Sequence, residues 1–324
     1  MRYDLNEDQA TFTTVLEQML SAPEAEFRTV ENWGRYEYGT ALDAQLEENG
    51  FFEAAREPEL GTVAAALMVY ETAQAAVCLE CGASSLIRPF LGREVPRPLA
   101  VVVDDAPGPI RFLPNARGLV SISDRGVSYA SVPQGATQGV DSLYAYPMGT
   151  IARDELDWED TDTDPAEMRV LWQVAVAAEL TGVLKAGMDA VIQYVSERKQ
   201  FGQPLGAFQA IQHRLAAAAV EIEGAKWQML RAAHSRTAQD AACALGYAQG
   251  MATRIGYDLH QFMGAMGLTL EHPLHRWTYR ARLLRAEERV DRTRKDLPFV
   301  EADGASAGRQ IEQRAPPVDE QAAH

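Results

Sequence analysis

The chain has 324 residues, which at about 150 residues per domain predicts two domains or one large helical domain with an insert. Its 47% hydrophobic and 23% charged residues are typical of a globular protein and exclude wholesale disorder. The 46 acidic and 30 basic residues give a net charge of −16, so nucleic-acid binding is not expected, because a phosphate backbone needs a basic face. Charged residues interrupt the long apolar runs, so no membrane-spanning helix is expected. Three cysteines cannot form a disulfide framework, which predicts a cytoplasmic protein.

Residues 1–96 are predicted to form an N-terminal helical domain. The first helix follows Asn6, and the second ends at Asn49-Gly50, a left-handed stop signal. A third helix is predicted over residues 62–82, where an alanine-rich sequence is apolar on nearly every side and is therefore expected to be buried. Cys78 and Cys81 form a C-x-x-C pair inside this run, and without a second ligand pair they are interpreted as ordinary buried thiols.

Residues 97–160 are predicted to form a small, shortened β-rich domain. Residues 99–103 are expected to be a strand. Residues 118–132 alternate between apolar and polar side chains on either side of a glycine-containing turn, which is typical of a hairpin.

Residues 161–296 are predicted to form a C-terminal four-helix bundle, followed by a flexible tail over residues 297–324. The bundle begins with Asp164-Pro165-Ala166-Glu167, a strong helix-start signal, and its first helix is expected to be some 36 residues long. Further helices are expected over 208–229, 237–266 and 273–294. Three possible ligands lie within residues 271–275, but the intervening proline and missing acidic partners argue against a metal site, and none is expected. The predicted fold class is mainly α with a small β domain.

The most informative stretch follows the long helix, where residues 198–216 read RKQFGQPLGAFQAIQHRLA. Two positive charges end one helix, a glycine and a proline form a sharp corner, and Gln209 lies in the first turn of the next helix. Such a corner can hold an anion, because guanidinium groups bind phosphate oxygens and a helix start carries partial positive charge. The same pattern also fits a helix–helix corner with solvated basic residues.

As a string, this stretch resembles the C-terminal signature of the acyl-CoA dehydrogenase family. A second block, HQFMGAMGLT at residues 260–269, is similar to the family's Q-x-x-G-G-x-G stretch, with Ala265 in place of the second glycine. The sequences LEENGFF at 46–52 and PELG at 58–61 resemble the family's first-domain pattern. The blocks occur in the family's order, and the predicted helical, β and helical layout agrees with its fold.

The resemblance implies that FAD lies at a subunit interface in a tetramer-like assembly. In that arrangement the C-terminal domain of one chain contacts the diphosphate and adenosine end of its neighbour's flavin, and Arg198 would bind the phosphates. The cofactor-binding residues carried over by position are Arg198, Gln200, Phe201, Phe208, Gln209, Gln261 and Gly264.

The family's reaction also needs a glutamate, which removes the α proton of a CoA thioester while a hydride passes from the β carbon to the flavin. Counting from Arg280, one family position for this base falls on Arg289. Counting back from Arg198, the other falls on Trp172. Neither side chain can act as this base, so no catalytic residue is expected in this chain.

Two features of the sequence bear on this expectation. If the family's base position is counted from Arg282 instead of Arg280, it falls on Glu288. Glu287 or Glu288 therefore remains an alternative as a shifted base. In the β-rich region, residues 103–109 read VDDAPGP and supply no hydroxyl partner for a flavin ring. One end of the family's flavin site is therefore predicted to be retained and the other lost.

These observations predict a non-catalytic subunit of a heteromeric, FAD-dependent acyl-CoA dehydrogenase. The chain resembles the smaller subunits of α2β2 enzymes of steroid side-chain degradation, in which a complete, base-bearing chain shares FAD with its partner. The expected substrate is then a steroid side-chain CoA thioester, and a separate electron acceptor reoxidises the flavin. Two alternatives remain open, a self-sufficient dehydrogenase with a relocated base and a flavin-free helical interaction protein.

Overall fold

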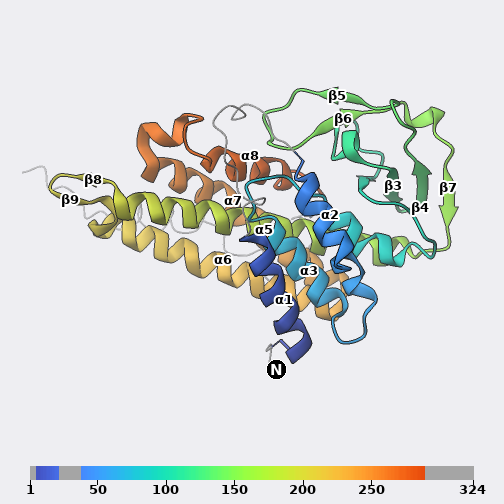
Figure 1. Cartoon of the computed structure of the whole chain (residues 1–324), viewed down its shortest axis with the longest axis horizontal. Helices are drawn as coiled ribbons and strands as arrows, with labels where there is room; N and C mark the ends of the chain where they lie inside the picture. Colours follow the sequence, from blue (N-terminus) through green and yellow to red (C-terminus); the bar gives the residue numbers. More distant parts are fainter. Residues whose placement is uncertain (1–4, 22–37, 289–324) are drawn as a thin grey trace, which may run out of the picture. The chain divides into compact units, whose positions relative to one another are not determined.

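The computed structural model describes residues 5–21 and 38–288 (Figure 1). The predicted tail over residues 297–324 and the base position at Arg289 lie outside the described residues. Within them, no helix is both long enough and apolar enough to cross a membrane. The chain combines helices at both ends with a smaller region of strands between them, which confirms the predicted fold class.

The N-terminal helices are α1 (Glu7–Leu20), α2 (Thr40–Glu48), α3 (Gly61–Thr72) and α4 (Gly82–Leu86), with short 3₁₀ turns η3 (Phe51–Arg56) and η4 (Arg88–Phe90). The start of α1 is fixed by a capping box, in which Asn6 Oδ1 accepts from the Gln9 backbone N–H at 2.7 Å and Gln9 Oε1 accepts from the Asn6 N–H at 3.3 Å. The predicted stop after α2 is confirmed, because Gly50 follows Asn49 with φ +73°.

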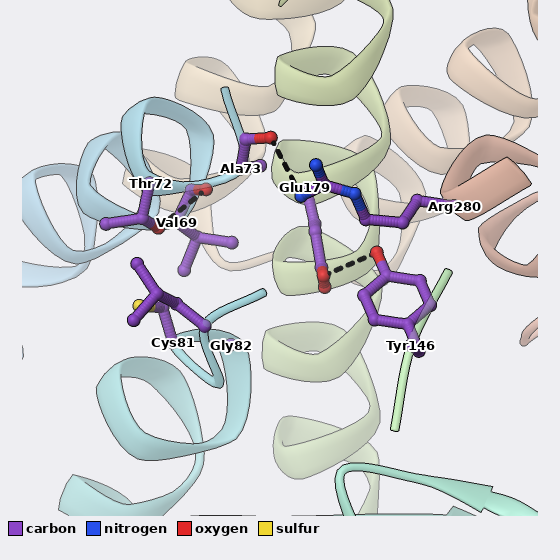
Figure 2. Close-up of a pocket in the computed structure, with 9 residues that line it drawn as sticks. Val69, Thr72, Ala73, Cys81, Gly82, Tyr146, Glu179 and Arg280 are labelled. Atoms are coloured by element: carbon purple, nitrogen blue, oxygen red, sulfur yellow. Dashed lines mark hydrogen bonds between the residues drawn. The ribbon is translucent and has the colours of Figure 1, made fainter. Parts of the chain in front are cut away.

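The prediction of a single helix over residues 62–82 is wrong. The structure ends α3 at Thr72 and begins α4 at Gly82, with a non-helical segment between them. Two arginines of α8 hold this segment by binding its carbonyls. Arg280 donates to the Ala73 carbonyl at 3.4 Å (Figure 2). Arg280 also donates to Ala75 at 2.8 Å, and Arg276 donates to Ala76 at 3.4 Å. Carbonyls that accept these tertiary hydrogen bonds no longer need helical partners.

The C-x-x-C pair therefore lies outside a helix. Cys78 pairs with Tyr38 in an isolated parallel bridge, and Cys81 precedes the first residue of α4. Both thiols are nevertheless buried, as predicted, and burial raises the pKa of each above its ordinary value. The two sulfurs are therefore protonated at neutral pH and behave as core groups.

The strands between the two helical regions form two small sheets. One sheet has the order β1 (Leu99–Val103), β3 (Gly118–Ser123), β4 (Gly126–Ser131) and β7 (Glu159–Thr161), and the other has the order β2 (Ile110–Arg111), β6 (Met148–Thr150) and β5 (Gln138–Val140). The predicted hairpin is confirmed, since β3 pairs antiparallel with β4 from Gly118↔Ser131 to Ser123↔Gly126. The predicted strand at residues 99–103 is β1, which pairs in parallel with β3.

The C-terminal bundle consists of α5 (Pro165–Glu197), α6 (Gln209–Ser235), α7 (Ala238–Met263) and α8 (Leu274–Leu284). Asp164 caps α5 by accepting from the Ala166 N–H at 3.0 Å, and the 33 residues of this helix make a rod of about 50 Å. The third helix ends three residues earlier than predicted, where the 3₁₀ turn η8 (Gly264–Leu268) begins. The fourth ends at Leu284 rather than 294.

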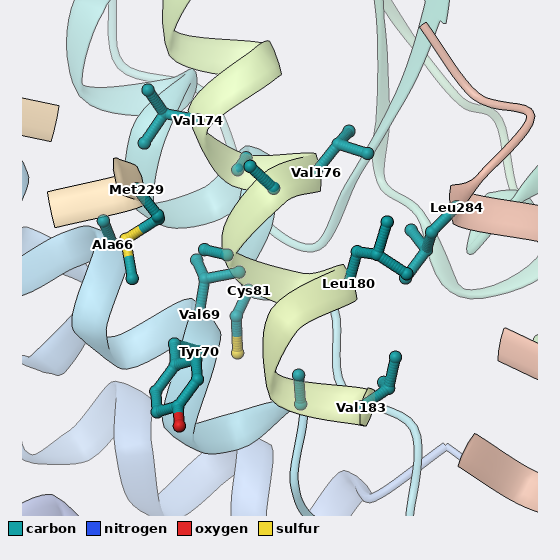
Figure 3. Close-up of a cluster of buried hydrophobic side chains, with 14 of the residues drawn as sticks. Ala66, Val69, Tyr70, Cys81, Val174, Val176, Leu180, Val183, Met229 and Leu284 are labelled. Atoms are coloured by element: carbon teal, nitrogen blue, oxygen red, sulfur yellow. The ribbon is translucent and has the colours of Figure 1, made fainter. Parts of the chain in front are cut away.

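The long helix α5 passes through the middle of the core and contacts α3, α6, α7 and α8. Its buried apolar side chains meet α3, α6 and the end of α8 (Figure 3). The side chains labelled in the figure are Ala66, Val69, Tyr70, Cys81, Val174, Val176, Leu180, Val183, Met229 and Leu284. This shared core fixes the helix ends that carry the sites described below.

The crossing of α3 and α5 depends on Gly182, because a Cβ there would lie 2.2 Å from the backbone oxygen of Tyr70. We expect Gly182→Ala to lower the free energy of unfolding by about 1–3 kcal/mol, the cost of overpacking a core contact. Gly246→Ala on α7 is the control, because nothing lies within 4 Å of its added Cβ and the change should stabilise the helix by about 0.5–1 kcal/mol. Chemical denaturation measures the free energy of unfolding of each variant. Equal changes in the two variants would contradict the close contact between Gly182 and α3.

Candidate functional site

The corner predicted between α5 and α6 is a short hairpin. After Arg198 caps α5, β8 (Lys199–Gln200) pairs with β9 (Gln203–Pro204), and a 3₁₀ turn η7 (Leu205–Ala207) leads into α6. Phe201 and Gly202 form the turn with φ +55° and +84°. The Leu205 N–H donates to the Arg198 carbonyl at 2.8 Å, which closes the corner. The corner therefore has a fixed backbone, from which the Arg198 side chain projects exposed to solvent.

The end of α7 meets this corner and encloses a cavity of about 620 Å³. Four of the predicted cofactor-binding residues line it, and they are Arg198, Gln200, Gln261 and Gly264. Gly264 ends α7 with φ +58° and ψ −135°, a conformation that glycine adopts without the strain a Cβ brings. The tertiary structure thus brings together residues that lie some sixty positions apart in the sequence.

The other three predicted residues are near this cavity but do not line it. Phe201 is 88% exposed, and its ring meets the edge of Phe208 with 6.2 Å between centroids. Gln209 is exposed at the first position of α6. We call Phe201, Phe208 and Gln209 the outer lip of the corner.

Sequence reasoning missed Arg214, which also lines the cavity. Its guanidinium lies 4.9 Å from the centroid of Phe262 and pairs with Asp258. The available signal was its spacing on α6, because Arg214 comes four residues after Ala210 and three after Ile211 and so shares the helix face that lines the cavity.

The chemistry of the cavity suits an anion. Among the described residues Arg198 pairs with no carboxylate, and no side chain caps the N-terminus of α6. The first backbone N–H groups of α6 and one free guanidinium are therefore available for phosphate oxygens. These features fit the diphosphate of a dinucleotide, with Gly264 allowing close backbone approach.

A second polar cluster, centred on Arg111 of β2, lies in the interior. Arg111 Nη1 donates to Glu179 of α5 at 2.7 Å, and Arg111 Nε donates to Glu287 at 2.7 Å. The Tyr146 hydroxyl donates to the other oxygen of Glu179 at 2.7 Å (Figure 2). The Arg111 guanidinium also lies 5.2 Å from the ring centroid of Trp172. This cluster joins the β-rich region, the long helix and the end of the bundle in one ionic network.

The candidate positions for a catalytic base fall in or beside this cluster. Trp172 is 3% exposed and packs against Arg111. Glu287 is held by its ion pair with Arg111, and Glu288 accepts from Arg169 at 3.1 Å and from Gln173 at 3.2 Å. Both carboxylates border a cavity of about 400 Å³ beside residues 101–111, and both are engaged by cations. In these contacts each glutamate serves as the partner of an arginine.

Comparisons with known proteins find relatives in sequence and in fold. Residues 173–288 match the family described as acyl-CoA dehydrogenase, C-terminal domain. A probable acyl-CoA dehydrogenase of Bacillus subtilis, YngJ, is 39% identical over 121 residues, which cover 36% of this chain and 32% of that protein. The matched part of this chain therefore spans about a third of the length of its curated relatives.

Two solved structures share the fold over nearly the whole chain. The ChsE4-ChsE5 complex from Mycobacterium tuberculosis has a TM-score of 0.72 at 17% identity and covers 98% of this chain and 100% of its own. A steroid ACAD variant, Tcur3481-Tcur3483, has a TM-score of 0.71 at 18% identity and covers 95% and 97%. The fold is that of the acyl-CoA dehydrogenases. Residues 173–288 belong to the C-terminal domain family of these enzymes.

Arg111 holds two buried carboxylates, so its removal tests the network. We expect Arg111→Met to lower the free energy of unfolding by about 3–5 kcal/mol, because Glu179 and Glu287 are left without a cation. Arg125→Met is the control, since its ion pair with Asp105 is exposed and should contribute less than about 1 kcal/mol. Denaturation curves of both variants measure this loss of unfolding free energy. A loss for Arg111→Met no larger than that for Arg125→Met would contradict a stabilising role for the ionic network.

Glu287 adds a pH dependence to stability. Burial raises the pKa of Glu287 above its ordinary value of 4.5, and Arg111 opposes that shift. Because the folded state holds this proton more tightly than the unfolded state, the contribution of Glu287 is greatest below pH 4.5 and is lost as pH rises through the folded pKa. The free energy of unfolding of Glu287→Gln relative to the wild type should therefore increase with pH over this window. A difference that is constant with pH would refute the raised pKa.

Proposed function

We propose that this chain is a non-catalytic, cofactor-contacting subunit of a heteromeric, FAD-dependent acyl-CoA dehydrogenase. The observation that carries the proposal is the contrast between two parts of one fold. The corner cavity offers to an anion an uncapped helix start and Arg198, which has no carboxylate partner among residues 5–21 and 38–288, whereas both candidate base glutamates are bound to arginines. A chain of this kind can contact a flavin without carrying out the reaction.

In this proposal the corner contacts a flavin that is shared with a different, complete chain. Arg198 and the first N–H groups of α6 would bind the diphosphate, and Gln200, Gln261 and Gly264 would line its path. Phe201, Phe208 and Gln209, on the outer lip, would contact the adenosine end. When bound, FAD accepts the hydride that leaves the β carbon of the acyl-CoA. The carboxylate that takes the α proton belongs to the partner subunit.

The cluster around Arg111 supports the absence of a base in this chain. A general base must be free to accept a proton from substrate. Glu287 instead accepts from Arg111 at 2.7 Å, and Glu288 accepts from Arg169. This geometry speaks against a self-sufficient enzyme with a relocated base.

The substrate class and assembly of the proposal draw on the structural relatives. ChsE4-ChsE5 is a complex of two named chains, and Tcur3481-Tcur3483 is named as a steroid ACAD. By analogy, we propose that this chain forms an α2β2 assembly with a base-bearing acyl-CoA dehydrogenase subunit and that the substrate is a steroid side-chain CoA thioester. A separate electron acceptor would reoxidise the flavin.

Expression of the chain alone and together with a candidate partner from an adjacent reading frame tests the proposal. We expect the chain alone to be colourless and inactive, and the co-purified complex to contain FAD and to dehydrogenate an acyl-CoA. A yellow, active product from this chain alone would favour a self-sufficient enzyme. A stable, colourless oligomer that does not co-purify with the candidate partner would favour a flavin-free interaction protein.

Arg198→Ala in the complex tests the corner. The loss of a charge-assisted phosphate contact worth about 1.5–3 kcal/mol should weaken FAD retention roughly 10- to 100-fold while the two chains still co-purify. Arg125→Ala removes the same charge from an exposed hairpin turn and should leave FAD content unchanged. The flavin absorbance per complex after dialysis is the measurement, and equal retention in the two variants would remove Arg198 from the site.

A further inference from the structure

A row of alternating charges joins α6 to α7 and reaches the corner cavity at one end. Asp258 of α7 accepts from Arg214 of α6 with Oδ1, and its Oδ2 accepts from Arg254 Nη1 at 3.4 Å. Arg254 in turn donates to Glu221 of α6. Arg254 and Asp258 lie four positions apart on α7, and Arg214 and Glu221 lie seven apart on α6, so each pair shares one helix face. We call these four residues the charge ladder, and together they carry no net charge.

Arg214 is the member of the charge ladder that lines the cavity. Its side chain is 44% exposed, whereas that of Asp258 is 5% exposed. A long, exposed side chain has many rotamers, and fixing it in one of them costs conformational entropy. Two groups restrict Arg214, the buried Asp258 carboxylate and the ring of Phe262, whose centroid lies 4.9 Å from the guanidinium. The cation is therefore held in place before any ligand binds.

The pairing with Asp258 leaves Arg214 with donors to spare. A guanidinium carries five N–H groups, and the contact with Asp258 uses one of the two terminal nitrogens. Within the described part of the chain, Asp258 is the hydrogen-bond partner of this guanidinium, so its other N–H groups remain for a ligand. Arg198 lines the same cavity but is exposed and has no carboxylate among the described residues to orient it. The two arginines of the cavity thus differ in how firmly they are held.

We propose that Asp258 is a positioning residue of the corner, which holds Arg214 so that its free N–H groups face an anion in the cavity. The inference rests on the proposed function, in which the corner contacts the diphosphate of a shared flavin. It adds a residue that acts through another side chain, because Asp258 itself does not line the cavity. The charge ladder then serves the site as well as the packing of α6 against α7.

A positioning role predicts an effect of opposite sign to that of the charge alone. If only charge matters, removing a carboxylate near an anion site strengthens anion binding, because a repulsion is lost. If the carboxylate orients the cation that makes the contact, removing it weakens anion binding. If the ion pair only joins two helices, its removal changes stability and leaves anion affinity as it was.

Calorimetric titration of the full chain with inorganic pyrophosphate tests this sign. We expect Asp258→Ala to weaken pyrophosphate binding at least about threefold, a coupling typical of residues in contact. Asp258→Asn keeps an oxygen that accepts from Arg214 and should bind at least as tightly as the wild type. Glu221→Ala is the matched control, because it removes a carboxylate from the same ladder but not the partner of Arg214, and it should not weaken binding. Equal or tighter binding by Asp258→Ala would overturn the proposal.

A double-mutant cycle separates positioning from a general loss of structure. Arg214→Ala should weaken pyrophosphate binding roughly 10- to 100-fold, the effect of one charge-assisted contact. In the Arg214→Ala background, Asp258→Ala should cause no further loss, because its effect passes through the guanidinium. Circular dichroism checks that each variant folds. A further loss of the same size in that background would show that Asp258 acts elsewhere and would refute the positioning role.

Arginine side-chain ¹⁵N relaxation reads the positioning directly and needs no ligand. The order parameter of Arg214 Nε should fall in Asp258→Ala and stay at its wild-type value in Asp258→Asn and Glu221→Ala. An unchanged order parameter in Asp258→Ala would mean that Asp258 does not hold this side chain.

The titrations also distinguish this inference from the proposed function. Pyrophosphate binding that Arg198→Ala weakens but Asp258→Ala does not would keep the anion-binding corner and remove Asp258 from it. A wild-type chain that does not bind pyrophosphate would contradict the corner itself, and with it both the proposed function and the role of Asp258.

Discussion

The buried ion pairs of Arg111 are the interaction on which the interior of this protein depends. Arg111 lies on β2, Glu179 lies on α5, and Glu287 follows α8, so one guanidinium connects three parts of the fold that are distant in sequence. Charges are costly to bury unless they are paired and hydrogen-bonded. The same ion pairs therefore hold the strands against the bundle. They also engage the carboxylate of Glu287, which would otherwise be a candidate base.

The corner at the other end of α5 is built on the opposite principle. It exposes a guanidinium, an uncapped helix start and an aromatic side chain, and this guanidinium has no carboxylate partner within the described part of the chain. Phe201 is 88% exposed at a residue whose φ is positive, and such an exposed aromatic is unusual unless it meets another surface. The fold thus combines a closed interior with an outward-facing corner, which is the arrangement that the proposed function requires.

The arginines of α8 show how tertiary contacts override a local preference. The alanine-rich sequence after residue 62 favours a helix, and α3 does begin there. Arg276 and Arg280 nevertheless bind the carbonyls of Ala73, Ala75 and Ala76 from about 200 residues away in the chain. The helix ends, and the cysteine pair falls in an extended segment and the start of α4. No periodicity in the local sequence encodes this contact.

The sequence by itself determined the order of the helical, β-rich and helical regions, the cap at Asp164, the hairpin at residues 118–131 and the corner at Arg198. Each of these depends on residues close together in the chain, through caps, turns and hydrophobic period. Only the tertiary structure decided that Gln261 and Gly264 meet Arg198, that Arg214 joins them, and that Arg111 engages Glu287. These contacts depend on how α5, α7 and the strands pack, and the pairing of buried charges is specified by distance in space rather than by spacing along the sequence.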